Sequence, residues 1–317
     1  MTPRPTFVAL VEDYLALRRR LGFGLVTQGR TLLAFARHAD RVTPEGPLTV
    51  ELAVQWATSC RSQDPSAATR RLACARGFAR HRALFDPTTE VPPLGLLGPG
   101  YRRKPPHVYS SAEIAALLGA AAELRPSGGL RPRTYTTLFG LLASTGLRVS
   151  EARCLACRDV DLRAGVVTVR EGKFRKSRLV PLHPSAVAAL RRYAADRDCC
   201  RVAPRSEHFF RTERLAVLSR MAVQRTFAKL RRCLGWSAEG RARLPRLQDL
   251  RHAFVVRRML RWYEQGADVD CRMAHLATYL GHAKVTDTYW YLTAVPELMA
   301  VTARRFERFA REQGGAS

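Results

Sequence analysis

The sequence predicts a mainly α-helical protein with one small β-sheet, an α+β fold in two domains. Apolar residues recur every three or four positions over most of the chain, as in residues 5–22, and this is the period of an amphipathic helix. Only two short runs, 166–169 and 178–182, have the composition of β-strands, and a turn separates them. A stretch rich in proline and glycine, at about 86–108, divides the helices before it from the mixed region after it.

The first predicted domain, residues 1–88, is helical throughout. We expect helices at about 5–22 and 27–40, a third that Thr49 caps, and a fourth from Ser66 to about Leu84. The fourth carries the arginines that we single out as DNA contacts: Arg70, Arg71, Arg76 and Arg80. An arginine on a helix can bind a phosphate or read a base edge, but for any one of them a solvated face is the alternative.

A linker at 89–108 follows, and it is basic near its end. Arg102, Arg103 and Lys104 form a cluster there, which we expect to lie against a nucleic-acid backbone.

The second predicted domain, residues 109–317, mixes helices with the two strands. Ser110 and Glu113 have the spacing of a helix-capping box, and Gly146 ends a second helix. Residues 198–222 carry no clear pattern. The expected helices are 110–124, 133–144, 184–196, 222–234, 249–264, 270–280, 284–293 and 297–312.

Charge is the most unusual bulk property of the chain. Its 317 residues include 53 Lys and Arg but only 27 Asp and Glu, which gives a net charge of +26. Such a chain repels itself unless a polyanion neutralises it, so nucleic acid is the first partner to consider. A general preference for arginine in the source proteome explains only part of the surplus. No stretch can span a bilayer and no secretory signal opens the chain, so we expect a soluble cytoplasmic protein without membrane contact.

The eight cysteines do not predict a metal site. Cys154 and Cys157 have the spacing of a zinc-binding pair, but no second pair with matching spacing follows. We therefore expect free thiols and no bound metal.

Four stretches carry residues that suit chemistry on a phosphodiester. They contain Arg148, Lys173, Arg251 and, near the end, His282 followed nine residues later by Tyr291. Arginine binds phosphate oxygens through two hydrogen bonds in one plane, a lysine can protonate a leaving alkoxide, and a tyrosine hydroxyl can attack phosphorus. Each stretch alone has an ordinary structural explanation, such as a surface ion pair, a solvated turn or a core histidine.

Taken together and in this order, the stretches resemble the tyrosine recombinases, the phage integrase family. The residues that carry the resemblance are Thr-Gly-Leu-Arg-x-Ser-Glu at 145–151, Gly172-Lys173 with Arg-Leu-Val-Pro-Leu at 178–182 after it, Leu-Arg-His-Ala-Phe at 250–254, and Leu-Gly-His at 280–282 with Tyr291. It covers about two-thirds of the chain, from about Ser110 to the end. It implies a SAM-like helical core-binding domain followed by a catalytic domain, the two clamping a DNA duplex.

The resemblance also implies a role for each residue. Arg148 and Arg251 would bind the scissile phosphate, Lys173 would act as general acid, and His282 would hydrogen-bond the phosphate. Tyr291 would attack phosphorus and form a 3′-phosphotyrosyl link. Neither a metal nor another cofactor is implied. From the residues alone, Lys176 competes with Lys173, whereas Tyr289 is turned to another helix face than Tyr291.

One position departs from the family pattern. The family usually has a histidine three residues before its second arginine, but this chain has Gln248 before Arg251. A glutamine can hydrogen-bond a phosphate oxygen, but it cannot exchange a proton at neutral pH. His252 is adjacent but is expected to point elsewhere, and Glu151 is expected to support the arginine region.

We therefore predict a site-specific DNA recombinase or integrase of a mobile element, acting as a homotetramer on paired sites in double-stranded DNA. The alternative is a catalytically weak or inactive DNA-binding partner of other recombinases in a multi-protein element, and a DNA-relaxing topoisomerase is a third hypothesis. The last predicted helix, 297–312, would dock into a neighbouring subunit, as the resemblance implies, or pack on its own domain.

Overall fold

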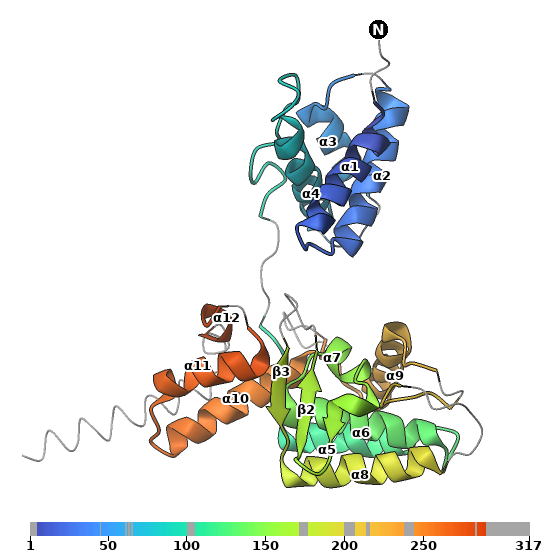
Figure 1. The fold of residues 1–317 in the computed structure, drawn as a ribbon, viewed down its shortest axis with the longest axis vertical. Helices are drawn as coiled ribbons and strands as arrows, with labels where there is room; N and C mark the ends of the chain where they lie inside the picture. The colour runs from blue at the N-terminus through green and yellow to red at the C-terminus, as the bar shows by residue number, and fades with distance from the viewer. Residues whose placement is uncertain are drawn as a thin grey trace, which may run out of the picture. The chain divides into compact units, whose positions relative to one another are not determined.

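The computed structural model describes residues 5–44, 46–60, 62, 64, 66–99, 105–170, 177–199, 207–213, 216–237, 244–282 and 284–289. The chain forms two compact units, Met1–Arg103 and Lys104–Ser317. Within the described residues the structure is mainly helical with one three-stranded sheet, which confirms the predicted α+β class (Figure 1). No helix in these described ranges is long and apolar enough to cross a membrane.

The first unit is a bundle of helices built around aromatic and aliphatic side chains. Its helices are α1 (Phe7–Arg20), α2 (Val26–Val42), α3 (Val50–Thr58) and α4 (Ala67–Arg82). Phe35, Trp56 and Phe78 are buried in its core, and the rings of Phe35 and Trp56 meet edge to face with centroids 5.1 Å apart. Thr49 caps α3 as predicted, since its side chain accepts a hydrogen bond from the Leu52 amide.

The second unit contains the sheet and the longer part of the chain. Its elements are α5 (Ser111–Ala122), α6 (Leu130–Thr145), α7 (Val149–Arg153), η1 (Cys157–Asp159), β1 (Val160–Asp161), β2 (Val166–Val169), β3 (Arg178–Pro181), α8 (Pro184–Asp198), α9 (Arg220–Cys233), α10 (Asp249–Glu264), α11 (Val269–Leu280) and α12 (Thr286–Tyr289). The predicted helices over these ranges are present, with ends that differ by a few residues. The short elements α7, η1 and β1 were not predicted, because so few residues carry no periodic pattern.

The sheet is antiparallel, with strand order β1-β2-β3. Val167 lies opposite Val180, and Val169 lies opposite Arg178. Val167, Val169 and Val180 are buried, so one face of the sheet covers the core of the unit. Residues 170–177 join β2 to β3, and the predicted turn with Lys173 and Lys176 lies outside the described residues.

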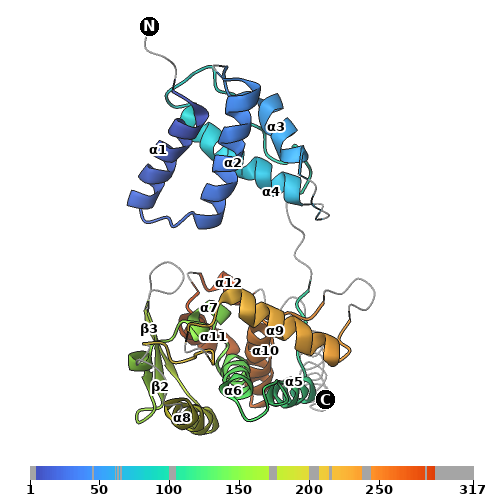
Figure 2. The ribbon, with the colours of Figure 1, turned by 90° about the vertical axis from the view of Figure 1, so that its right-hand side faces the viewer.

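The helix α6 lies at the centre of the second unit and packs against α5, α8 and α10 (Figure 2). Leu138, Phe139 and Leu142 of α6 are fully buried in the core. The predicted capping box at the start of α5 is present, because Ser110 and Glu113 exchange side-chain-to-backbone hydrogen bonds. Of the predicted helix 284–293, the structure describes α12, and the predicted helix 297–312 lies outside the described residues.

Candidate active site

The C-terminal end of α11 is the point on which the functional arginines converge. The last carbonyl groups of a helix have no partner within the helix and attract cations. Here three consecutive carbonyls each accept a hydrogen bond from a different arginine. Arg178 Nε donates to Tyr279 at 2.7 Å, Arg251 Nη2 to Leu280 at 2.8 Å, and Arg148 Nη2 to Gly281 at 3.3 Å. Side chains from β3, α10 and the start of α7 therefore meet at one corner.

Glycines at two helix ends make this convergence possible. Gly281 ends α11 with a φ of 68°, a left-handed conformation that a side chain makes costly. A Cβ atom there would lie 2.8 Å from Arg178 Nη1. Gly146 ends α6 with a φ of 64°, and a Cβ atom there would lie 2.6 Å from the Phe254 ring. Both glycines allow close approach of elements that a larger residue would hold apart.

Arg251 is the most buried of the three arginines. It lies in the first turn of α10 and is 3% exposed. Its Nη1 donates to the Gly146 carbonyl at 2.8 Å, so one guanidinium joins the end of α6 to the end of α11. These bonds fix its plane and direction before any phosphate is bound.

Glu151 lies between Arg148 and Arg178 and binds both. Its Oε1 accepts from Arg148 Nη1 at 2.7 Å, and its Oε2 accepts from Arg178 Nη2 at 2.8 Å and from the Arg148 backbone amide at 3.0 Å. Burial acts to raise the pKa of the Glu151 carboxyl, but the hydrogen bonds from Arg178 and Arg148 outweigh it and hold that pKa below its ordinary value. Glu151 therefore supports the arginines as a carboxylate.

His282 follows Gly281, and each of its two ring nitrogens has a hydrogen-bond partner. Its Nε2 lies 2.8 Å from Arg251 Nη2, and its Nδ1 lies 2.6 Å from the Thr288 hydroxyl. A guanidinium can only donate, so in the neutral ring Nε2 accepts and the proton is on Nδ1. Burial and the charges of Arg251 and Arg148 lower the pKa of His282 to about 4. The imidazole is therefore neutral near pH 7 in the DNA-free protein.

The nucleophile and general-acid candidates lie outside the described residues: Tyr291, Lys173 and its competitor Lys176. The last described helix, α12, comes shortly before Tyr291 in the sequence. Thr288, which holds His282, is fully buried on α12, and α12 ends at Tyr289, two residues before Tyr291.

Gln248 occupies the N-cap position of α10, three residues before Arg251. It is partly buried, and its side chain makes no capping hydrogen bond within the described structure. His252 lies beside Arg251 in sequence but on another side of the helix, with its Nε2 4.0 Å from Asp249 Oδ1. Burial lowers the pKa of His252 to about 4. Neither residue supplies a histidine at the position where the family has one.

Two partly buried histidines, His252 and His282, predict a pH dependence of stability. An unfolded histidine gains its proton near pH 6.5, whereas His252 and His282 stay neutral down to about pH 4. Below pH 6.5 the unfolded state therefore binds more protons, and the free energy of unfolding is expected to fall as the pH is lowered toward 4. After allowance for partial solvent screening, the loss is about 1–2 kcal/mol for each residue.

Urea denaturation at a series of pH values tests this expectation. His252→Gln should reduce the loss between pH 6.5 and pH 4.5, whereas the same change at the exposed His275 should leave it unaltered. Equal pH dependence in the wild type and His252→Gln would show that burial of His252 is not the cause.

The arginines predicted to bind DNA on α4 differ in their surroundings. Arg71 is half-buried, stacks over the Trp56 ring at 4.1 Å and donates to the Trp56 carbonyl. Arg76 donates to the Pro92 carbonyl at 2.7 Å, and Arg70 forms an exposed ion pair with Asp64 at 2.8 Å. Arg80 is exposed. Arg102, Arg103 and Lys104 of the linker lie outside the described residues.

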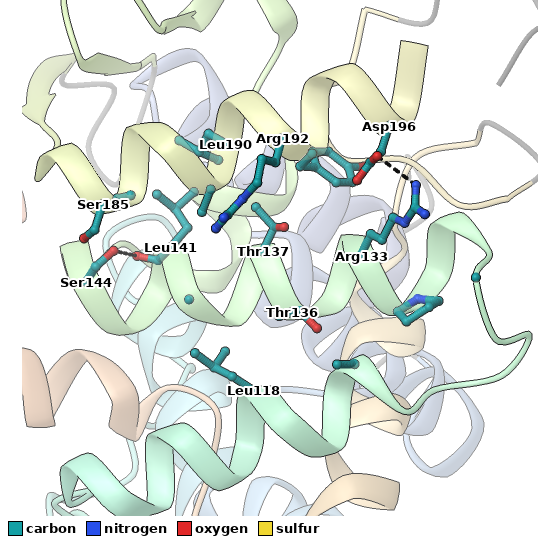
Figure 3. Close-up of a pocket in the computed structure, with 17 residues that line it drawn as sticks. Leu118, Arg133, Thr136, Thr137, Leu141, Ser144, Ser185, Leu190, Arg192 and Asp196 are labelled. Atoms are coloured by element: carbon teal, nitrogen blue, oxygen red, sulfur yellow. Dashed lines mark hydrogen bonds and ion pairs between the residues drawn. The ribbon is translucent and has the colours of Figure 1, made fainter. Parts of the chain in front are cut away.

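A cavity elsewhere in the second unit is not part of this site. It has a volume of about 660 Å³ and lies between α5, α6 and α8, with Leu118, Thr137 and Leu190 in its wall (Figure 3). The ion pair between Arg133 and Asp196, 2.8 Å long, lies at its edge. None of the arginines at the end of α11 lines it. Among the described residues, no group of three or more His, Cys, Asp or Glu could hold a metal ion.

Sequence reasoning missed two residues of the site. It assigned Arg178 to a strand and gave it no function, although the side chain reaches the end of α11 and Glu151. It also gave no role to Thr288, which binds His282. The spacing of the motifs could not predict these contacts. Arg178 is 27 positions from Glu151 and 101 positions from Tyr279, and the contact of Thr288 with His282 depends on the turn after Gly281.

Comparisons with known proteins agree with this geometry. The model of the phage integrase family matches residues 108–297. One relative bears the name "Putative integrase/recombinase y4rB" and comes from Sinorhizobium fredii (strain NBRC 101917 / NGR234). It is 43% identical to this chain over 308 residues, which cover 96% of this chain and 98% of y4rB.

Two solved structures share the fold. One is the Tn1549 transposon integrase in complex with transposon right end DNA, with a TM-score of 0.64 and 15% identity, covering 96% of this chain and 100% of that one. The other is a lambda integrase tetramer bound to a Holliday junction, with a TM-score of 0.63 and 17% identity, covering 92% of this chain and 78% of that one. At these identities the likeness concerns the fold alone.

Proposed function

The chain belongs to the phage integrase family, and on this premise we propose that it is a site-specific recombinase that cleaves and rejoins duplex DNA through Tyr291. The observation that best supports this function is the convergence of Arg148 and Arg251 on the end of α11, where Arg251 also contacts His282. Preorganised cations at one corner suit the charge that develops on a phosphodiester under attack.

In the proposed reaction the Tyr291 oxygen attacks phosphorus and the bond from phosphorus to the 5′ oxygen breaks. Arg148 and Arg251 bind the non-bridging oxygens, and Lys173 gives a proton to the leaving 5′ oxygen. The products are a 3′-phosphotyrosyl ester and a free 5′-hydroxyl. A 5′-hydroxyl from a partner duplex reverses the step and joins the new strand. The ester keeps the bond energy, so the reaction needs neither ATP nor a metal.

His282 is the proposed acceptor of the Tyr291 hydroxyl proton, which Gln248 cannot take. The neutral His282 has its lone pair on Nε2, where it accepts from Arg251. A bound phosphate competes with His282 for the hydrogen bond from Arg251. When Arg251 turns to the phosphate, Nε2 of His282 is free to accept the proton of the Tyr291 hydroxyl. The protonated ring then donates to a phosphate oxygen, and the anion offsets the arginine charges that otherwise keep the pKa of His282 low.

We propose double-stranded DNA as the partner and a homotetramer on paired sites as the active assembly, serving a mobile element in the cytoplasm. The net charge of +26 suits a polyanion. The transposon integrase bound to transposon end DNA and the lambda integrase tetramer bound to a Holliday junction share this fold, and their named complexes motivate the proposal. In the same arrangement Arg70, Arg80 and the linker residues Arg102, Arg103 and Lys104 would contact the DNA backbone.

A suicide substrate tests the function. A duplex is first selected from a randomised library by binding to the protein, and the selected sequence is then nicked a few nucleotides beyond each position in turn. Cleavage at the correct position releases a short fragment that diffuses away, which traps the protein on the 3′ end. A covalent complex that withstands denaturant is expected. Tight binding without any such complex would favour the alternative function.

That alternative is a catalytically weak or inactive DNA-binding partner of other recombinases, and Gln248 is the observation that favours it. We expect Gln248→His to raise the cleavage rate by about tenfold, because acid–base assistance is worth about 10²–10⁴-fold where it operates and a grafted histidine recovers part of it. Gln248 makes no capping bond in the described structure, so the exchange should not disturb α10.

The matched control is Gln248→Asn, which keeps an amide and cannot exchange a proton. It should not accelerate cleavage. A rate for Gln248→His equal to or below that of the wild type would mean that the site is adapted to glutamine.

A further inference from the structure

The guanidinium of Arg178 makes three hydrogen bonds at the site, to two other elements. It begins β3, directly after the segment that carries Lys173, and its side chain is 10% exposed. Its Nε donates to the Tyr279 carbonyl at 2.7 Å, while Nη1 and Nη2 donate to the two Glu151 oxygens at 3.3 and 2.8 Å. One guanidinium thus joins the sheet, α7 and the end of α11.

The charges at this corner show what Arg178 contributes. Glu151 is buried, with 6% of its side chain exposed, and its carboxylate also binds Arg148. If Arg148 were its only partner, the pair would be neutral. Arg178 adds a second guanidinium to the same carboxylate, so the three residues together keep one net positive charge. That charge is needed if Arg148 is to attract a phosphate.

The position of Gly281 gives an independent reason to regard Arg178 as more than a surface ion pair. The guanidinium fills the space next to the Gly281 Cα, where a Cβ atom would lie 2.8 Å from Nη1. Arg178 therefore packs against the turn that orients His282. Losing it would leave the Tyr279 carbonyl and Glu151 without a donor that they have in the structure.

We propose that Arg178 is a positioning residue of strand cleavage, which neutralises Glu151 so that Arg148 keeps its charge for the scissile phosphate, and which holds the end of α11 so that His282 faces that phosphate. This inference rests on the proposed recombinase function. Arg178 itself contacts Glu151 and the α11 backbone rather than the DNA.

Double substitution separates the charge effect from loss of structure. Arg178→Met should slow covalent complex formation by about 10²-fold, the size of effect seen when a preorganised donor is lost. In that variant Glu151 is left to neutralise Arg148. Adding Glu151→Gln removes the excess negative charge, so the double variant should react at least about tenfold faster than Arg178→Met.

The controls address folding. Arg133→Met removes an arginine from another ion pair of the same unit, at the start of α6 and about 20 Å along that helix from Gly146. It should react at the wild-type rate. Arg178→Lys keeps the charge and should stay within about tenfold of the wild type, provided that circular dichroism shows a folded chain. A rate for Arg178→Met near that of the wild type, or a double variant no faster than Arg178→Met, would overturn the inference.

A second measurement does not depend on cleavage. His282 can be titrated by nuclear magnetic resonance in the DNA-free protein, where burial and the charges of Arg251, Arg148 and Arg178 act to lower its pKa and Asp287 acts to raise it. Arg178→Met should raise the pKa of His282 above that of the wild type, and the added Glu151→Gln should lower it again. An unchanged titration in Arg178→Met would overturn the inference. If the titrations respond as expected but the wild type forms no covalent complex, the proposed function fails and the role of Arg178 in setting the charge stands.

Discussion

Tyr291→Phe is expected to abolish the covalent complex with DNA while leaving DNA affinity within about twofold of the wild type. The substitution removes one oxygen, which is the proposed nucleophile, and no positive charge that binds phosphate. The phenyl ring that remains carries no oxygen and cannot attack phosphorus. Denaturing electrophoresis with a nicked duplex measures the complex, and a filter-binding titration measures the affinity.

Tyr289→Phe is the matched control, since it makes the same change two residues earlier on α12. It should keep the covalent complex. If Tyr289→Phe is the inactive variant and Tyr291→Phe reacts, the nucleophile is wrongly assigned.

Arg251→Met is expected to lower the cleavage rate by at least about 10³-fold and to destabilise the second unit as well. The guanidinium is buried and donates to the Gly146 and Leu280 carbonyls and to His282. Its loss removes a proposed ligand of the phosphate and leaves buried acceptors unpaired, at a cost of about 1–3 kcal/mol each. The single-turnover rate and the thermal midpoint are the two measurements.

Two further variants distinguish these effects. Arg251→Lys keeps a positive charge but cannot reach the same partners with the geometry of a guanidinium, so its cleavage should remain well below the wild type. Arg258→Met removes an exposed arginine from the same helix and should alter neither the rate nor the midpoint appreciably. Cleavage by Arg251→Met within tenfold of the wild type would exclude Arg251 from the reaction.

The helices of this chain could be predicted closely because their signals are local. The period of apolar residues placed α10 at 249–264, where the structure has it, and Ser110 with Glu113 marked the start of α5. The strand at 166–169 was also predicted correctly from its run of β-branched residues. The short α7 and β1 were missed, since a few residues cannot show a period.

The site was predictable only in part, for a physical reason. Arg148, Arg251 and His282 stand in recognisable motifs, and the structure brings them together. Arg178 begins a quoted stretch, 178–182, but the stretch gave it no role, because its contacts are with Glu151 and with the left-handed turn at Gly281. Only the folded chain brings these partners to Arg178. The roles of Lys173 and Tyr291 remain predictions.

Mapping the residue that becomes linked to DNA tests the central claim most directly. The trapped complex is digested with trypsin and nuclease, and the peptide 285–304 is sequenced by fragmentation in a mass spectrometer, since it contains both Tyr289 and Tyr291. The predicted result is a nucleotide attached through its 3′-phosphate to Tyr291. A nucleotide on Tyr289, on a residue outside this peptide, or on none at all would contradict the proposed mechanism.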